Sequence, residues 1–314
     1  MPRVSKRRAI RGAILHAVLR AAASLAAALG LSRARAFGRF LGTLSWHLVR
    51  RERRRALEHL ALAFPDWPEP RRRDTIRGMF RHLGESLMEI LWLPQLDPAM
   101  RARLTEWRGL ERLRPYLDAH RGVVIFTAHC GNWEWLANAF GFLGQPISVL
   151  QRERDDPKLN RFITEVRAKG GVLTIDRGSG NSARQMLGAI KRGALAFVVD
   201  QNIRTASVQV PFFGRPALTP IGPARLAVRA EAVVVTMLIE RRPDGTHLIH
   251  VSEPVETKRD DDPVALTARV TRQIEEQIRR VPEQWVWMHR RWRDRPQWDV
   301  GTRGGDAVSS EAPE

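Results

Sequence analysis

A histidine with a glutamate five positions later follows a run of apolar residues near the middle of the chain. Residues 123–126 (VVIF) are typical of a buried strand, and the run ends in a polar segment, residues 127–135 (TAHCGNWEW). A histidine that is held by a carboxylate can take a proton from an alcohol. Glu134 can reach His129 only across a turn, and Gly131 and Asn132 are residue types that permit one. The pattern therefore predicts general-base chemistry by His129, with Glu134 in the first turn of the next helix.

Alternating strand and helix patterns surround this segment. Apolar runs typical of strands occupy residues 123–127, 147–150, 172–175, 195–199, 233–239 and 248–251, and helical patterns occupy residues 71–93, 133–143, 157–168, 182–191, 221–229 and 264–280. This order predicts an α/β fold with a largely parallel central sheet covered by helices on both faces. Ligands bind at the carboxyl ends of strands in such sheets, which is where His129 falls. We expect this domain to span residues 56–300 and residues 301–314 to be disordered.

The composition excludes several kinds of site. The 314 residues include one cysteine, Cys130, so neither an internal disulfide nor a cysteine-rich metal site can form, and the compartment is expected to be reducing. The nine histidines show no metal-binding spacing, so no metal and no cofactor is predicted. In strand geometry Cys130 faces away from His129, which argues against a cysteine nucleophile. With 43% hydrophobic residues, the body of the chain is expected to be globular.

Residues 1–55 are strongly basic and are expected to associate with a membrane. They hold 14 Lys and Arg and one acid, while the whole chain has a formal charge of +18. The 19 residues 13–31 would span about 28 Å as a helix, but Arg20 in the middle opposes insertion. A helix lying in the interface is therefore as consistent with the sequence as a span. Residues 34–49 add bulky apolar side chains between arginines, a composition suited to an anionic membrane surface.

Other interpretations of the basic segment are weaker. A cleaved signal peptide is disfavoured because Arg20 interrupts the apolar stretch. Nucleic acid also attracts clustered arginine, but the arginines here flank apolar helices and no nucleic-acid motif is present, so no nucleic-acid partner is predicted. A solvated basic tail is the third alternative. A non-enzymatic membrane- or nucleic-acid-binding module would use this segment alone and would not need His129.

Motifs along the chain resemble a known enzyme family. TAHCGNWEW resembles the HX4D/E signature of the glycerolipid acyltransferase superfamily, and in detail the lipid A biosynthesis (lauroyl/myristoyl) acyltransferases. Further similar segments are residues 54–57 (RRAL) with 63–65 (AFP), 199–202 (VDQN), 212–216 (FFGRP) with 219–222 (TPIG), and 282–285 (PEQW) with 295–296 (RP). The resemblance covers about residues 10–297.

The resemblance implies an O-acyltransferase in which His129 is the general base. The base would deprotonate a lipid hydroxyl as the hydroxyl attacks a thioester, without a covalent enzyme intermediate. Glu134 would orient the base, but an acid at the position of Asp200 lies beside the histidine in relatives, so either carboxylate can be its partner. Arg167 corresponds to an arginine near the family's site, where it would bind a phosphate or stabilise the oxyanion. The motif positions also make Asn132, Arg177, Gln201 and Gly214 candidate substrate-binding residues.

The implied partners are an acyl carrier protein as donor, anionic membrane lipids, and a lipid acceptor. The implied location is the cytoplasmic face of the inner membrane. A lipid A precursor is the first acceptor hypothesis, and another membrane lipid, such as a glycosylated phospholipid or a lysophospholipid, is the alternative. The basic charge suits both the acidic carrier protein and a phosphorylated acceptor. Acyl chain length and oligomeric state do not follow from the sequence.

Overall fold

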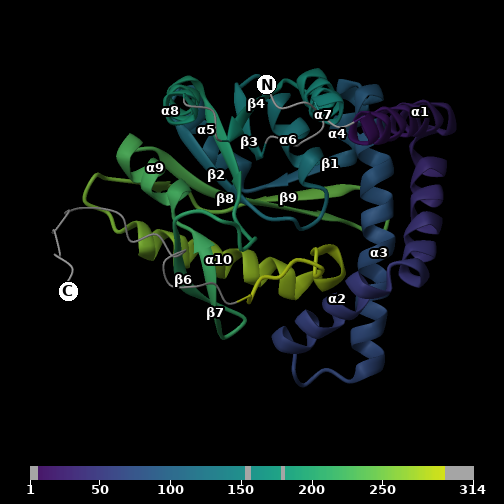
Figure 1. Cartoon of the computed structure of the whole chain (residues 1–314). Coiled ribbons are helices and arrows are strands. Elements are labelled where there is room, and N and C mark those ends of the chain that lie inside the picture. The colour runs from purple at the N-terminus through teal and green to yellow at the C-terminus, as the bar shows by residue number, and fades with distance from the viewer. Residues whose placement is uncertain (1–5, 153–156, 178–180, 294–314) are drawn as a thin grey trace, which may run out of the picture.

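A computed structural model describes residues 6–152, 157–177 and 181–293 (Figure 1). Its central sheet has the strand order β1-β9-β8-β2-β5-β3-β4, with the short β10 paired to β8. The pairs are parallel except for β8 with β9 and β8 with β10. The strands are β1 Thr105–Arg108, β2 Val123–Thr127, β3 Ile147–Arg152, β4 Val172–Arg177, β5 Ala194–Val198, β8 Val233–Arg241, β9 His247–Val251 and β10 Val255–Glu256. The predicted α/β class with a largely parallel sheet is confirmed.

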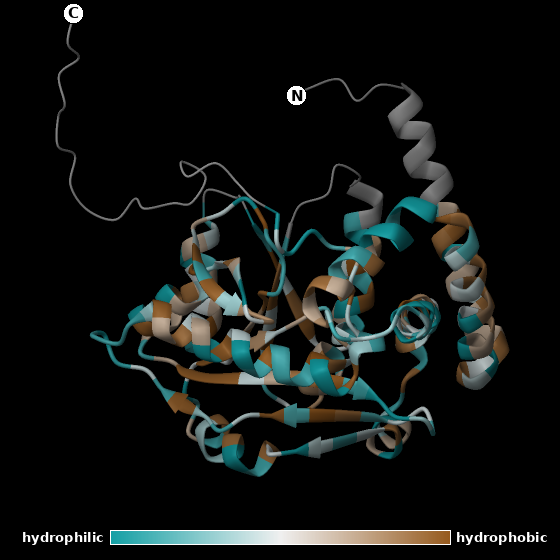
Figure 2. Ribbon diagram, turned by 90° about the horizontal axis from the view of Figure 1, so that it is seen from below, coloured by the Kyte–Doolittle hydropathy of each residue, from teal (hydrophilic) through white to brown (hydrophobic). Residues whose placement is uncertain are grey.

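Helices cover both faces of this sheet, as predicted. The helices of the body are α5 Leu110–Asp118, α6 Trp133–Gly141, α7 Pro157–Lys169, α8 Ser182–Arg192, α9 Gly222–Ala230 and α10 Pro263–Arg280. Alternate residues of β2 enter different cores: Val123 and Ile125 pack with α5 and α6, whereas Val124 and Phe126 pack with α8, α9 and α10. Figure 2 shows hydrophobic residues concentrated in the strands and mixed colouring on the helices. Since β2 is central and buried on both faces, the segment that follows it is firmly placed.

A β-hairpin and the segment after α10 complete the body. A hairpin of β6 Ser207–Phe212 and β7 Arg215–Pro220 packs against α10, and its turn uses the positive φ angles of Phe213 and Gly214. The segment after the 3₁₀ helix η2 Pro282–Gln284 is also buried: Trp285 and Trp287 are enclosed, and Arg291 bonds Thr219 Oγ1 at 2.6 Å. Residues 285–293 therefore close the fold by aromatic and arginine packing, while residues 294–314 lie outside the described part.

The N-terminal helix α1 Lys6–Leu48 bends at Gly30 and packs along α3 Glu69–Trp92. α2 Arg50–Ala63 connects the two, and η1 Leu93–Gln95 with α4 Pro98–Leu104 lead from α3 to the sheet. The contact between α1 and α3 requires glycine, since a Cβ on Gly38 would lie 2.4 Å from the carbonyl oxygen of Gly84. Along α3, Ile76 and Phe80 are buried, whereas Leu87 is 46% exposed.

Replacement of Gly84 by alanine is expected to destabilise the protein. The added Cβ would lie 2.1 Å from the carbonyl oxygen of Gly38, so the two helices must separate. Overpacking of this kind costs about 1–3 kcal/mol of unfolding free energy. The measurement is thermal or denaturant unfolding of Gly84→Ala. Gly222→Ala is the matched control, because a Cβ there meets nothing within 4 Å. Equal stability of the two variants would show that α1 and α3 do not need the close approach.

Candidate active site

His129 and Asp200 form a hydrogen-bonded pair at the carboxyl end of the sheet. Nδ1 of His129 lies 2.8 Å from Oδ1 of Asp200, and the backbone N–H of His129 donates to Oδ2 at 3.0 Å. The indole Nε1 of Trp285 donates to the same Oδ2 at 2.7 Å. An ionised carboxylate only accepts hydrogen bonds, so Nδ1 carries the proton of the neutral imidazole. In this tautomer the lone pair is on Nε2, which can accept a proton.

Asp200 is buried yet stays ionised. Its side chain is 1% exposed, while that of His129 is 23% exposed. Burial alone would raise the pKa of Asp200, but the charge of His129 and the hydrogen bonds from His129 and Trp285 lower it to about 2. The carboxylate is therefore a fixed negative charge behind an imidazole that solvent can reach. Such a charge stabilises the imidazolium that forms when Nε2 takes a proton.

Strand order brings these two residues together. β2 and β5 are paired with Thr127 opposite Val198, so each side chain follows its strand by two residues at the same sheet edge. The turn after His129 is fixed by Gly131, whose φ is 65° and whose Cβ would lie 2.0 Å from the carbonyl oxygen of Ile239. Cys130 forms a β-bridge with Trp285, which anchors the other side of the turn. The imidazole is thus positioned by backbone contacts on both sides.

Glu134 does not contact the imidazole. It forms a two-point ion pair with Arg167, whose Nε and Nη2 lie 2.9 and 2.6 Å from the carboxylate oxygens. Nη1 of Arg167 also donates to Gln151 Oε1 at 2.9 Å. Burial would lower the pKa of Arg167, but Glu134 raises it, so the guanidinium is charged. Of the two carboxylates left open by the sequence, Asp200 is paired with His129 and Glu134 is paired with Arg167 in the structure. The catalytic role of each carboxylate stays a prediction.

Three further residues that were predicted to bind substrate lie in different parts of the structure. Nε2 of Gln201 lies 3.5 Å from Nε2 of His129, so its amide borders the reactive nitrogen. Arg177 ends β4, at the far edge of the sheet. Gly214 lies in the turn of the β6–β7 hairpin, with a φ of 68°. No contact between His129 and either of these two residues is found among the described residues.

Asn132 was predicted to bind substrate, but both ends of its amide are used within the protein. It is 1% exposed, its Oδ1 accepts from the backbone N–H of Trp135 at 3.1 Å, and its Nδ2 donates to Glu89 at 2.8 Å. The first contact caps α6, which begins directly after it. Asn132 therefore positions the turn between His129 and Glu134, and its predicted contact with substrate stays a prediction.

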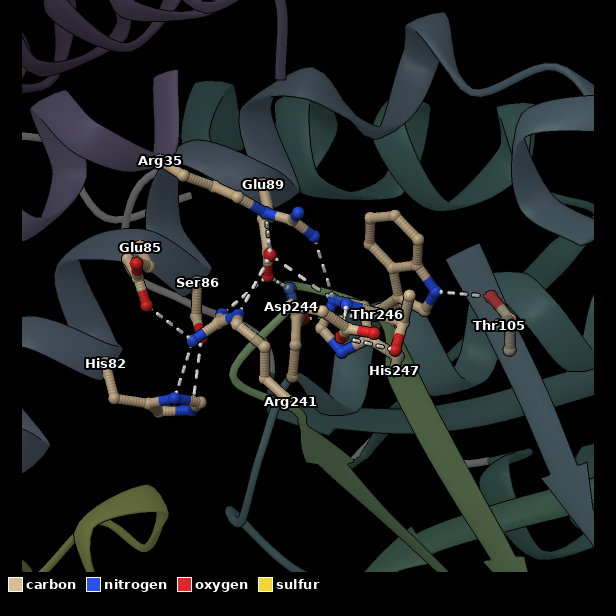
Figure 3. Close-up of polar contacts among 12 residues, drawn as sticks. Arg35, His82, Glu85, Ser86, Glu89, Thr105, Arg241, Asp244, Thr246 and His247 are labelled. Atoms are coloured by element: carbon tan, nitrogen blue, oxygen red, sulfur yellow. Dashed lines mark hydrogen bonds and ion pairs between the residues drawn. The ribbon is translucent and has the colours of Figure 1, made fainter. Parts of the chain in front are cut away.

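A buried ion network beneath this turn was missed by the sequence analysis (Figure 3). Its centre is Glu89, which is fully buried and is bonded by Arg241 at 2.6 and 3.0 Å and by Arg35 at 2.6 Å. Burial would raise the pKa of Glu89, but His247 and Arg241 lower it well below its usual range. His82 and Glu85 bind the far side of Arg241. Through these hydrogen bonds the network links side chains of α1, α3 and β8 to the amide of Asn132.

The stability of the protein is expected to fall as the pH is lowered from 7 to 5. Burial, followed by the charge of Arg241, lowers the pKa of His82 from 6.5 to about 3. Between these values the unfolded chain binds a proton that the folded protein excludes, so stability drops by up to about 1.4 kcal/mol per pH unit. The half-buried His289, whose pKa is lowered to about 4 chiefly by loss of solvent, adds to this slope. The lowered pKa of Glu89 contributes to the pH dependence of stability only at pH values below this range.

Unfolding measured across this pH range tests the contribution of His82. His82→Gln removes the titrating group but keeps a side-chain acceptor for Arg241, so the variant is expected to show a shallower pH slope. It is also expected to be less stable than the native protein at pH 7. Identical slopes would contradict the assignment of His82 as a buried neutral imidazole.

Cys130 takes no part in the site. It is 1% exposed, and burial, followed by the negative charge of Asp200, raises the pKa of its thiol above the usual range. A thiol that does not ionise is a poor nucleophile. The sequence-based rejection of a cysteine nucleophile agrees with this environment.

Known proteins are similar in sequence to this chain over most of its length. The family model for the bacterial lipid A biosynthesis acyltransferases matches residues 2–294. The chain belongs to this family. The resemblance drawn from the motifs is thereby confirmed, and the protein is an acyltransferase.

Two characterised groups appear among the relatives of this acyltransferase. The chain is 30% identical over 265 residues to the lipid A biosynthesis lauroyltransferase of Escherichia coli K12, covering 82% of this chain and 84% of the relative. It is 29% identical over 270 residues to the lipid A biosynthesis palmitoleoyltransferase of the same organism, with the same coverage. It is also 24% identical over 226 residues to the phosphatidylinositol mannoside acyltransferase of Mycolicibacterium smegmatis, covering 70% and 72%. The relatives of this chain thus include enzymes named for different acyl groups and different acceptors.

Proposed function

We propose that this acyltransferase moves a fatty acyl group from an acyl carrier protein thioester to a hydroxyl of a lipid A precursor, with His129 as general base. The observation that carries the proposal is the Asp200–His129 pair, in which a buried carboxylate 2.8 Å from Nδ1 favours the tautomer with its proton on Nδ1 and its lone pair on Nε2. A base of this kind suits an alcohol, which is a weak nucleophile at neutral pH.

The proton follows a closed path in this mechanism. Nε2 of His129 takes the proton of the acceptor hydroxyl as its oxygen attacks the thioester carbonyl, and the imidazolium is stabilised by Asp200. The tetrahedral intermediate then collapses, the carbon–sulfur bond breaks, and the leaving thiolate takes the proton from His129. The products are an ester and a free thiol, and the enzyme returns to its starting state. No side chain is acylated.

We propose that two other side chains assist the reaction. Gln201 borders Nε2 of His129 at 3.5 Å and would bind the incoming hydroxyl or the carbonyl oxygen. Arg167, held by Glu134 and Gln151, keeps N–H groups beyond those two partners and would bind a phosphate or the developing oxyanion. Glu134 then acts by orienting Arg167. Arg177 and Gly214 would contact more distant parts of the substrates.

The acceptor is proposed from the relatives. The two Escherichia coli enzymes, each covered over 84% of its length, are named for lipid A biosynthesis, which supports a lipid A precursor. The mycobacterial relative is named for a phosphatidylinositol mannoside, so a glycosylated phospholipid is the second candidate. The proposed donor is an acidic carrier protein, which suits the basic chain. The proposed location is the cytoplasmic face of the inner membrane.

The lipid profile of a deletion strain tests the acceptor. Loss of the gene is expected to leave lipid A without one secondary acyl chain, and the mass of that chain identifies the donor. The native protein should restore it, whereas His129→Ala should not. Unchanged lipid A together with an altered phospholipid or glycolipid would reject the first acceptor in favour of the second.

A further inference from the structure

The turn between His129 and α6 is held by contacts on two sides. On one side lies the segment after α10, where the backbone carbonyl oxygen of Gln284 accepts from the N–H of Gly131 at 3.0 Å. On the other side lies α3, where Oε2 of Glu89 accepts from Nδ2 of Asn132 at 2.8 Å. A single carboxylate on a distant helix thus reaches the turn that carries the imidazole.

The position of this carboxylate is itself fixed by two arginines. Oε2 of Glu89 also accepts from Nη2 of Arg241 at 2.6 Å, and Oε1 accepts from Nε of Arg35 at 2.6 Å. Figure 3 shows the side chains of Arg35 and Arg241 reaching Glu89 from different elements, α1 and the end of β8. The amide of Asn132 therefore meets an anion that is restrained from two further directions.

Stability alone does not account for a network of this kind. The side chains of Glu89, Arg241 and Arg35 are 0%, 6% and 10% exposed, so all three charged groups have lost most of their water. Replacing buried ion pairs by apolar residues of similar size is often neutral or stabilising. A role in fixing one geometry explains the retained charges better than a role in stability does.

Arg241 reaches the same turn by a second path. Its backbone N–H donates to Oε1 of Gln284 at 2.8 Å, and its carbonyl oxygen accepts from Nε2 of Gln284 at 2.9 Å. Two residues before Arg241 on β8, the carbonyl oxygen of Ile239 would lie 2.0 Å from a Cβ on Gly131. The network and the turn therefore share a rigid connection at the end of β8.

Movement of this turn would displace both halves of the site. His129 lies three residues before Asn132, and Glu134, which binds Arg167, lies two residues after it in the first turn of α6. Oδ1 of Asn132 caps that helix, so the bond from its Nδ2 to Glu89 sets where the helix begins. A displacement of about 1 Å in a positioned group can lower a rate by about 100-fold.

We propose that Glu89 is a positioning residue of this acyltransferase, which fixes the turn carrying His129 and the start of α6 through its hydrogen bond to Asn132. It is buried away from the reacting atoms and acts only through that amide. Its effect on the reaction rests on the proposed function, whereas the positioning is a property of the folded chain without substrate.

Glu85 provides a matched control for Glu89. It lies one turn earlier on α3 and binds the same Arg241 at 2.9 Å, together with Arg39, and within the described ranges it has no hydrogen bond to Asn132. Glu89→Gln is expected to lower kcat by about 100-fold with little change in KM. Glu85→Gln removes the same charge from the same network and is expected to keep kcat near the native value. Equal kcat values for the two folded variants would overturn the proposal.

A reciprocal exchange tests the contact itself. Asn132→Asp keeps a capping oxygen for α6 but places a second carboxylate against Glu89, so it is expected to lower kcat. In Asn132→Asp/Glu89→Gln, the amide introduced at position 89 can donate to the carboxylate introduced at position 132, and the buried charge is conserved. This double variant is expected to be about tenfold more active than either single variant, since residues in direct contact are coupled. Activity no higher than that of the single variants would overturn the proposal.

A readout without turnover separates this inference from the proposed function. The NMR signal of the Nδ1 proton of His129, assigned by its absence in His129→Ala, reports the hydrogen bond to Asp200. It is expected to shift or broaden in Glu89→Gln and to stay at its native position in Glu85→Gln, and identical spectra of these two variants would contradict the positioning role.

A gentler variant keeps the test decisive where Glu89→Gln does not fold. Asn132→Ser retains a capping hydroxyl and every ion pair of Glu89 but lacks the amide donor. The same change in the His129 signal is expected, and a native signal with native kcat would overturn the proposal. A signal that responds to Glu89 in a protein that transfers no acyl group would support the positioning and reject only the proposed function.

Discussion

Replacement of His129 by alanine is expected to lower kcat for acyl transfer by about 10²- to 10⁴-fold, the usual contribution of a positioned general base. The loss should fall on kcat, because the imidazole acts when the hydroxyl proton is transferred and contributes little to binding. The side chain is only partly buried, so the variant is expected to fold. The measurement is transfer of a radiolabelled acyl group from the carrier-protein thioester to the purified lipid acceptor.

The neighbouring residue provides a control for this substitution. Cys130→Ala changes a buried core side chain next to His129, and it is expected to retain most of the activity. Native unfolding curves for both variants would show that neither change acts through the fold. Comparable activity of His129→Ala and Cys130→Ala would remove His129 from the mechanism.

Replacement of Asp200 by asparagine is expected to lower kcat by about 10³- to 10⁴-fold. Asparagine can donate a hydrogen bond to Nδ1 and so favours the tautomer that carries its proton on Nε2, which cannot act as the base. The change also removes the buried charge that stabilises the imidazolium. Because Trp285 and the backbone of His129 both donate to this carboxylate, some loss of stability is expected as well.

The comparison with Glu134→Gln decides which carboxylate serves the base. Glu134 is bonded to Arg167 and not to His129, so its amide variant keeps the tautomer of His129 and should lose activity mainly through a higher KM. A pH–rate profile with an unchanged shape for Glu134→Gln and an altered one for Asp200→Asn is the expected pattern. The reverse pattern would assign the orienting role to Glu134.

The sequence predicted those features of the site that depend on local patterns of residues. The strand of residues 123–127 and the position of His129 at its end follow from an apolar run and the polar residues after it, and the structure has β2 with these bounds. The choice between Glu134 and Asp200 depends on which strand lies beside β2. That neighbour is β5, which follows β3 and β4 in the chain, and no local pattern specifies this order.

The buried ion network could not be predicted from the sequence, for a different reason. Arg35, Glu89 and Arg241 come from distant parts of the chain, and each alone resembles a surface charge. One signal was present: His82, Glu85 and Glu89 recur at helical spacing on the buried face of α3. Polar residues placed regularly on an apolar face indicate a buried partner of opposite charge, which here is Arg241.

A single-turnover experiment tests the central claim most directly. Native enzyme in excess is mixed with an acyl carrier protein thioester and the lipid acceptor, and quenched samples are analysed for the lipid product and for the mass of the intact protein. Direct transfer assisted by His129 predicts acylated lipid with no acylated protein at any time, and no product on this time scale with His129→Ala. An acyl group on the protein, or undiminished product formation without the imidazole, would contradict the account.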